Sequence, residues 1–209
     1  MISLKTVRIE PVAEEAQPRA HAVYDVASGD PEGGAAGGKL MVTRGTGRRV
    51  REALGEVLEG LPGEGVLYVD TRGVELMDYS FADEALGILA SRVAAGEYGD
   101  RRVVLVEEDR ELLENIEASL RQRSLAMVRV DEPGAVPEIV GEVPEHLVET
   151  LDAIYDGGSI TNADLAAKLG LNHTACNNRA TRLFKLGLIR RRKNTAAPGG
   201  RQYSYEGIA

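Results

Sequence analysis

The stretch ADLAAKLGLNHTACNNRATRLFKLGLI, residues 163–189, decides the fold of the C-terminal part of this chain. Its apolar residues recur every three or four positions, the spacing expected when one face of a helix is buried. We predict two helices, one over residues 161–169 and one over residues 172–186. Gly170 and Gly187 follow them directly, and glycine is the residue that most often ends a helix. The two helices are therefore joined by a very short turn.

A third helix is predicted just before this pair. Residues 144–156 carry apolar side chains in helical register and are followed by two glycines. Thr161 then opens the next helix, and Asp164 completes a Thr-x-x-Asp arrangement that caps a helix start. Beyond the pair, residues 188–193 and 201–205 are predicted strands joined by a loop that contains glycine and proline.

Helix, tight turn and helix, followed by a hairpin or "wing", is an arrangement found in nucleic-acid-binding domains. About residues 144–209 resemble the winged helix-turn-helix domains of bacterial and archaeal transcription regulators. The phrase L-x-x-L-G-L-I-x-R, residues 183–191, matches the junction of helix and wing in that family. The resemblance implies a prokaryotic regulator that binds double-stranded DNA, and such regulators usually act as homodimers on two half-sites.

The charge distribution agrees with a DNA-binding C-terminus. The whole chain of 209 residues has a net charge of −8. Residues 171–209 contain eight basic residues and one acidic residue, a net charge of +7, which leaves −15 for the rest. Such an asymmetry favours a basic interaction surface on an acidic body.

The residues predicted to contact DNA lie on the outward positions of the last helix and on the wing. The first of them are amides, a hydroxyl and an imidazole that can bond base edges, and the later ones are basic and suited to phosphates. They are Asn172, His173, Thr174, Asn177, Asn178, Thr181, Arg182 and Lys185 in the helix, and Arg190, Arg191, Arg192, Lys193 and Arg201 in the wing. A protein-binding winged helix is the alternative, and the absence of acids from this helix disfavours it.

The first part of the chain alternates strands and helices, which predicts an α/β domain with one sheet and covering helices. We therefore expect an α/β domain over residues 1–130 and a winged helix-turn-helix domain, mostly α with a β wing, over residues 144–209. Residues 131–143 contain prolines that a helix cannot accommodate, so a linker is predicted there. The predicted strands are 2–9, 21–27, 66–69, 103–106 and 125–130, the predicted helices are 50–61, 81–95 and 111–123, and residues 29–39 form a glycine-rich loop.

Two motifs give the first domain a family resemblance. TRGTGRRVRE, residues 43–52, precedes a helix, and VDTRGVELMDYSFADE, residues 69–84, begins with a buried strand and ends in a helix start. Over about residues 38–130 the chain resembles the STAS domain, the fold of anti-sigma-factor antagonists, in a STAS-like variant. This resemblance implies a domain that senses a signal, either a small ligand or a protein partner.

Ser80 aligns with the serine that a partner kinase phosphorylates in the antagonists. Tyr79 replaces a serine and Phe81 replaces a glycine of the antagonist motif, so the fold carries over better than the phosphorylation. The alternative role for Ser80 is to cap the following helix, with Asp83 reaching back in a capping box. Carboxylates at Asp78, Asp83 and Glu84 would repel a phosphate.

Residues 43–49 invite a second interpretation as an anion site. Glycines and arginines precede a helix N-terminus, where an anion or a nucleotide phosphate could bind at Arg44 and Arg48. The Lys-Ser/Thr pair of a nucleotide-binding loop is missing. The alternative is that Thr43 or Thr46 caps the helix and the glycines form the turn.

Other classes of function are not expected. A single cysteine forms no internal disulfide, three scattered histidines make a poor metal site, and no apolar run is long enough to span a membrane. We find no Ser/His/acid set and no complete nucleotide loop, so neither an enzyme nor a cofactor is predicted. The chain is expected to be a cytoplasmic DNA-binding regulator; the alternative is a signalling adaptor of the antagonist type, regulated by phosphorylation of Ser80.

Overall fold

The computed structural model describes residues 20–28, 39–194 and 202–209. The chain divides into two units, residues 1–142 and residues 143–208, the second of which we call the winged unit. The predicted strand over residues 2–9, nearly all of the glycine-rich loop and Arg201 lie outside the described residues. Among the described helices, none is long and apolar enough to cross a membrane.

The first unit is built on a five-stranded sheet in the order β1-β3-β5-β6-β7. Strands β1 (His21–Asp25), β3 (Val66–Asp70), β5 (Arg102–Val106) and β6 (Ala126–Val130) run parallel to their neighbours. Strand β7 (Glu138–Gly141) pairs antiparallel with β6 at one edge. The alternation of strands and helices predicted this parallel arrangement, because parallel strands need a crossover between them.

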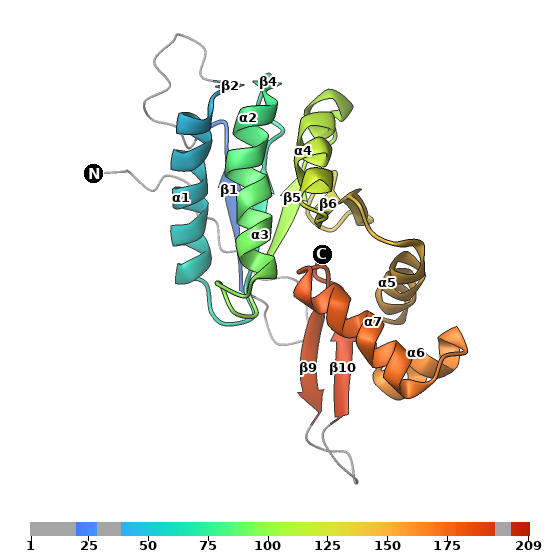
Figure 1. Cartoon of the computed structure of the whole chain (residues 1–209). Coiled ribbons are helices and arrows are strands. Elements are labelled where there is room, and N and C mark those ends of the chain that lie inside the picture. Colours follow the sequence, from blue (N-terminus) through green and yellow to red (C-terminus); the bar gives the residue numbers. More distant parts are fainter. Residues whose placement is uncertain (1–19, 29–38, 195–201) are drawn as a thin grey trace. The chain divides into compact units, whose positions relative to one another are not determined.

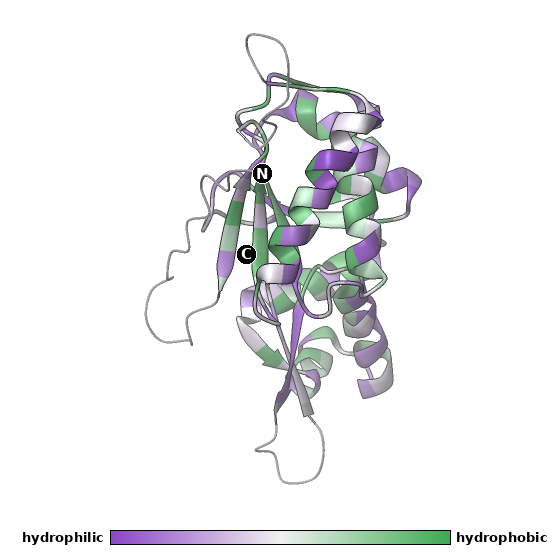
Figure 2. Ribbon diagram, turned by 90° about the vertical axis from the view of Figure 1, so that its left-hand side faces the viewer, coloured by the Kyte–Doolittle hydropathy of each residue, from purple (hydrophilic) through white to green (hydrophobic). Residues whose placement is uncertain are grey.

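Valine-rich strands explain why the centre of this sheet is buried. Every residue of β5 is buried, and β3 is mostly buried. Leu67 and Val69 belong to the core that the helices cover, whereas Val104 and Val128 alternate with core residues and are also fully buried. Figure 2 shows the strands largely hydrophobic and the helices divided into hydrophobic and hydrophilic faces. Continuous apolar runs of this kind are typical of central strands in α/β proteins.

Helices α1 (Arg44–Gly60) and α4 (Arg110–Gln122) lie on one face of the sheet, on either side of a third helical stretch (Figure 1). That stretch begins as α2 (Tyr79–Ala82), widens into the π-helical turn η1 (Asp83–Gly87) and continues as α3 (Ile88–Ala94). A mixed α/β fold is therefore confirmed for this unit. The π-helical turn was not predicted, and such turns often occur at functional sites.

The prolines led us to predict a linker over residues 131–143, but this segment is more than a linker. Strand β7 lies within this segment and adds an edge to the sheet. Pro133, Pro137 and Pro144 lie outside the strand, where the missing N–H breaks no ladder bond. Gly141 has φ 104°, and a Cβ there would come within 2.4 Å of the Leu125 carbonyl oxygen, so a glycine is required at the end of this strand.

Ser80 does not cap the helix that follows it. The cap is Asp78, whose Oδ1 accepts a hydrogen bond from the Phe81 backbone N–H at 2.7 Å. Ser80 is the second residue of α2 and is half-buried. The other carboxylate oxygen of Asp78 accepts from the Thr43 N–H at 3.1 Å, so one side chain holds the starts of both α2 and α1. The predicted Ser80–Asp83 capping box is therefore wrong by two residues.

This difference has a measurable consequence. Asp78→Ala is expected to lower the free energy of unfolding of the first unit by about 1–2 kcal/mol, because it removes the α2 cap and the tie to Thr43. Thr43 has φ 75°, an unfavourable conformation for a β-branched residue. In the variant it loses the hydrogen bond from its N–H to Asp78 that holds it in this conformation. Ser80→Ala is the matched control and should stay within about 0.5 kcal/mol of the wild type. Urea unfolding followed by circular dichroism compares the two; an equal loss in both variants would contradict the assignment of the cap.

The winged unit contains three helices in the predicted places: α5 (Glu145–Gly157), α6 (Asn162–Leu169) and α7 (His173–Lys185). The predicted cap of α6 is confirmed, because Thr161 Oγ1 accepts from the Asp164 N–H at 3.2 Å. Gly170, with φ 63°, ends α6 in the left-handed conformation that favours glycine.

A three-stranded sheet completes the winged unit, in the order β8-β10-β9. Strands β9 (Arg190–Asn194) and β10 (Gln202–Glu206) form the predicted hairpin. Strand β8 (Ser159–Thr161), which was not predicted, pairs antiparallel with β10 on the other side. Strand β10 is therefore central, and its backbone is paired on both sides.

Candidate nucleic-acid interface

Helix α7 is anchored at its first turn by side chains on both sides of the Gly170 turn. Asn172 caps it, with Oδ1 accepting from the Ala175 N–H at 2.8 Å. Asn162 of α6 donates from Nδ2 to the carbonyl oxygen of His173 at 3.3 Å. The angle between the two helices is thus set by hydrogen bonds as well as by packing. Asn172 turns its oxygen towards the helix backbone for the cap, which leaves its amide N–H groups available for another contact.

The inner face of α7 is apolar and tied to α5. Cys176, Ala180 and Leu183 are fully buried. Arg179 donates from Nη1 to the carbonyl oxygen of His146 at 3.0 Å and pairs with Glu149 at 3.2 Å. Arg179 is therefore a basic residue of this segment that connects helices and does not face outward.

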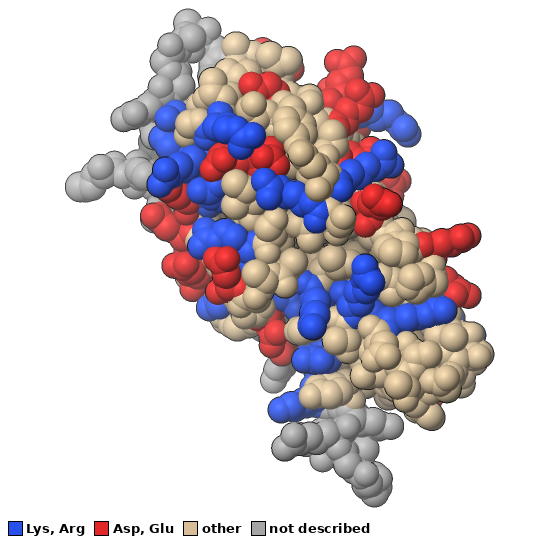
Figure 3. Space-filling view, in the orientation of Figure 1, with Lys and Arg blue, Asp and Glu red and all other residues tan. Residues whose placement is uncertain are grey.

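The outer face of α7 is exposed and contains no carboxylate. Its first two turns present uncharged hydrogen-bonding groups, and its last turn presents two cations. The exposed residues are Asn172, His173, Thr174, Asn177, Asn178, Arg182 and Lys185, and Thr181 is half-buried. In Figure 3 the basic side chains of the winged unit gather over the C-terminal end of α7 and the start of the wing. Eight of the predicted DNA contacts thus lie on one helix or its cap, and seven of the eight are exposed.

The wing places its basic residues in different environments. The guanidinium of Arg191 lies 4.4 Å from the ring centre of Phe184 and 4.6 Å from that of Tyr203. Such cation–π contacts order the side chain, which lowers the entropy that it loses on binding an anion. Arg192 pairs with Glu206 at 3.7 Å, and Lys193 is exposed.

Arg190 differs from the prediction. It is the first residue of β9 and only 4% exposed, so it is not on the surface that a nucleic acid could contact. Successive residues of a strand point to opposite faces, and Arg190 lies opposite Glu206 in the ladder. We therefore leave Arg190 out of the interface.

The two arginines predicted to form an anion site in the first unit are engaged with carboxylates. Arg44 pairs with Asp83 at 3.3 Å and with Glu84 at 3.5 Å, and Arg48 pairs with Glu52 at 2.8 Å. Thr43 caps α1, with Oγ1 accepting from the Thr46 N–H at 3.4 Å. Of Thr43 and Thr46, the two caps considered from sequence, the structure thus has Thr43. Anion binding at Arg44 and Arg48, and phosphorylation of Ser80, stay predictions.

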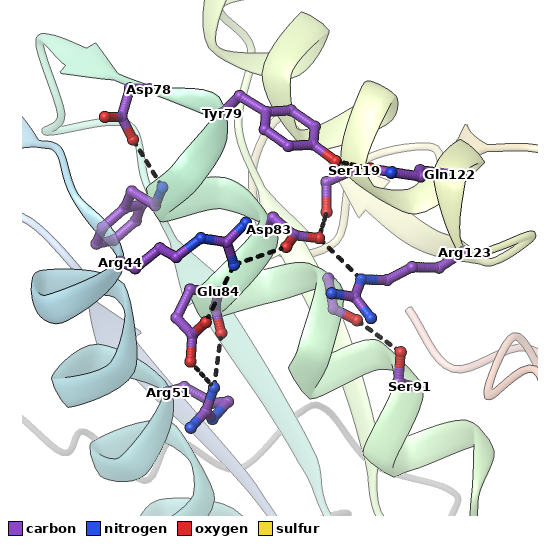
Figure 4. Close-up of polar contacts among 12 residues, drawn as sticks. Arg44, Arg51, Asp78, Tyr79, Asp83, Glu84, Ser91, Ser119, Gln122 and Arg123 are labelled. Atoms are coloured by element: carbon purple, nitrogen blue, oxygen red, sulfur yellow. Dashed lines mark hydrogen bonds and ion pairs between the residues drawn. The ribbon is translucent and has the colours of Figure 1, made fainter.

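Asp83 is the centre of a charged cluster between the helices (Figure 4). Asp83 is 5% exposed, and its Oδ1 accepts from Arg123 Nε at 2.8 Å and from Ser119 Oγ at 3.3 Å. Glu84 follows it and binds Arg51 of α1. Burial alone would raise the pKa of Asp83, but the hydrogen bonds and charge of Arg123, with Ser119 and Arg44, outweigh burial and lower the pKa below its usual range.

The described residues hold no group of three or more metal-binding side chains. Cys176 is fully buried, and burial raises the pKa of its thiol. A thiol in this environment is mostly protonated and weakly reactive. Its Sγ lies 3.7 Å from the carbonyl oxygen of Asn162, as a packed residue at the α6–α7 contact.

One residue of the interface was missed from sequence. Tyr205 of β10 is fully buried, and its hydroxyl donates to Oδ1 of Asn177 at 3.2 Å. Tyr203 and Tyr205 are two positions apart in a predicted strand, and side chains two positions apart in a strand point to the same face. That pattern was the available signal.

A comparison with protein families finds one match in this chain. Residues 145–196, from the start of α5 to just beyond β9, match the model of the MarR family. MarR family regulators are DNA-binding transcription factors and not enzymes, and they typically act as dimers. No curated protein and no solved structure matches the chain in the same comparisons.

The match supports a winged-helix DNA-binding transcription regulator, as predicted from residues 144–209. It also supports the prediction that the chain is not an enzyme. The match does not extend into the first unit, so the resemblance of that unit to STAS domains stays a prediction.

Proposed function

We propose that the protein is a sequence-specific transcription regulator in which α7 enters the major groove of double-stranded DNA. The N-terminal half of the helix reads base edges, and its C-terminal half contacts phosphates. The wing contacts the DNA backbone or the minor groove through Arg191, Arg192, Lys193 and Arg201.

The outer face of α7 is the observation that carries this proposal. Its imidazole, hydroxyl and amide groups can bond the donors and acceptors that the major groove displays. The two cations that follow, Arg182 and Lys185, are exposed and suited to the backbone. A solvated helix without a partner usually mixes acids with bases, whereas this face has no acid at all.

We further propose that two copies bind two half-sites, and that the first unit regulates the complex by sensing a small ligand or a protein partner. The dimer follows from the winged-helix class, in which half-site spacing reflects the symmetry of the protein. The acidic body, with a sequence charge of −15 outside residues 171–209, would repel DNA and lower nonspecific binding.

The experiment is the capture of random genomic fragments by purified full-length protein. The wild type is expected to enrich a small set of shared sites. His173→Ala/Asn178→Ala is expected to lose this enrichment while still binding DNA at low salt, because base contacts are worth about 1–3 kcal/mol each and phosphate contacts are unchanged.

The matched control is Val148→Ala/Asp152→Ala, two exposed positions on α5 in the same unit. It should enrich the same sites as the wild type. If the wild type enriches no site at low salt, the regulator hypothesis fails, and phosphorylation of Ser80 in a signalling adaptor becomes the hypothesis to test.

A further inference from the structure

Tyr205 and Asn177 connect the wing sheet to the exposed face of α7. Asn177 is the fifth residue of α7 and is exposed, one turn beyond His173. Tyr205 lies in the central strand β10, paired with Ile160 on one side and Arg191 on the other. Its side chain is fully buried, and its hydroxyl reaches α7, where it lies 3.2 Å from Asn177 Oδ1.

The hydroxyl proton decides which way the Asn177 amide points. Burial raises the pKa of Tyr205, so the phenol keeps its proton. Within the described part of the chain, Asn177 Oδ1 is the acceptor that this proton has. If the amide were turned around, its N–H would donate to the hydroxyl and leave the phenolic proton without an acceptor, which is costly for a buried group. The oxygen of the amide therefore faces Tyr205, and its two N–H donors face outward.

We infer that Tyr205 is a positioning residue that makes Asn177 a hydrogen-bond donor to a base. This inference rests on the proposed function, in which α7 lies in the major groove. A free asparagine amide can donate and accept together, the pattern that adenine matches through N7 and N6. An amide whose oxygen is turned towards Tyr205 favours bases that present acceptors without a donor, which are guanine through O6 and N7 and thymine through O4. Cytosine presents only a donor there and is disfavoured.

The test is selection of binding sites from a randomised DNA pool by the full-length protein. Asn177→Ala identifies the base pair that Asn177 contacts, as the position where the selected preference disappears. In the wild type, a G·C pair there should lose its preference when guanine is replaced by 7-deazaguanine, and an A·T pair should keep its preference when adenine is replaced by 7-deazaadenine, because guanine or thymine is then the contacted base. Tyr205→Phe should weaken the preference at the same base pair by about three- to tenfold, the value of one hydrogen bond, and leave the other positions unchanged.

Tyr203→Phe is the matched control. It removes a hydroxyl two residues away on the same strand and keeps the ring that stacks on Arg191. This variant should select the same site as the wild type. Combining Tyr205→Phe with Asn177→Ala should add no further loss at the shared base pair, since both changes act on one interaction.

Asn177→Asp tests the inference without altering the buried tyrosine. The carboxylate still accepts from Tyr205 but has no donor, so the preferred base should change towards cytosine, whose N4 group donates. The inference is overturned if Asn177→Ala changes no position, if 7-deazaadenine removes the preference for an A·T pair there, or if Tyr205→Phe keeps a preference that Asn177→Ala loses. A wild type that selects no site at all would instead overturn the proposed function.

Discussion

Asp83→Ala is expected to lower the free energy of unfolding of the first unit by about 2–4 kcal/mol. The substitution leaves Arg123 without its partner at 2.8 Å and takes an acceptor from Ser119, which is fully buried. Breaking a fully buried ion pair typically costs roughly 3–5 kcal/mol, and the smaller value here reflects solvent at Arg44 and Arg123. The side chain of Arg44 is 60% exposed, so its ion pair with Asp83 adds little.

Tight packing around Asp83 strengthens this expectation. A Cβ at Gly87 would lie 2.2 Å from Ser119 Oγ, and a Cβ at Gly47 would lie 2.9 Å from Glu84 Cβ. Helices α1 and α4 therefore approach the π-helical turn closely on both sides. A cavity left by the carboxylate cannot be filled by a simple shift of one helix, so the cost of the substitution is not relieved.

The effect should depend on pH in a defined direction. Because the pKa of Asp83 is lowered in the folded state, its contribution is fully present above the ordinary aspartate pKa of about 4. The contribution is lost as the pH falls through the lower folded-state pKa. The stability difference between the wild type and Asp83→Asn should therefore be constant above about pH 5 and shrink at more acidic pH.

Hydrogen exchange followed by mass spectrometry is the suitable measurement, because it separates the two units. Peptides from α1 and α4 should lose protection in Asp83→Ala, and peptides from α5 and α7 serve as an internal reference. Glu52→Ala removes an exposed partner of Arg48 and should leave the protection of these peptides at the wild-type level. A loss in Asp83→Ala as small as that of Glu52→Ala would show that the cluster does not hold these helices.

Periodicity and caps made the helices of the winged unit predictable from sequence. The apolar spacing in α7 and the Thr161–Asp164 cap are local features, determined by residues within one or two turns. The valine-rich strands β3 and β5 were predicted for the same reason. Elements whose signals are contained in a short segment can be inferred without any knowledge of the partners in space.

The errors all depend on residues far apart in the chain. Strand β7 exists because β6 offers an edge to pair with, and its own sequence gives no strong signal beside three prolines. Asp78 takes the cap because it also holds Thr43, 35 residues away. Both Asp78 and Ser80 are good capping residues, so local preference alone did not choose between them.

In the candidate interface too, local features were predictable from sequence and features set by long-range contacts were not. The acid-free outer face of α7 could be inferred from helical periodicity. The burial of Arg190 and the role of Tyr205 follow from the strand register, which pairs Arg190 with Glu206 and Arg191 with Tyr205. Charge alone did not separate the buried arginine of the wing from the accessible ones, because RRRK gives no apolar alternation to read.

Arg182→Ala/Lys185→Ala is expected to weaken DNA binding by about 100-fold at low salt, with similar losses on specific and nonspecific sequences. Both side chains are exposed in the last turn of α7. Neither has an ion pair among the described residues, so the substitutions remove charge from the surface without leaving a carboxylate unpaired. Phosphate contacts carry no sequence information, which is why the loss should not depend on the site.

Salt dependence distinguishes lost phosphate contacts from damage to the fold. Each phosphate contact removed lowers the slope of log K against log salt by about one, so the double variant should have a slope smaller by about two. Fluorescence anisotropy with labelled duplexes over a range of salt concentrations measures both the affinity and the slope. The control Arg92→Ala/Arg121→Ala removes a half-buried and an exposed cation from the first unit, where each pairs with a glutamate.

The control should keep the wild-type slope, because the first unit has no part in the proposed contact. An equal change of slope in both variants would mean that net charge, and not the position of the cations on α7, governs binding. An unchanged slope in Arg182→Ala/Lys185→Ala would remove these residues from the interface. Since His173 and Asn178 affect preference and Arg182 and Lys185 affect salt dependence, the two kinds of variant separate base contacts from phosphate contacts along one helix.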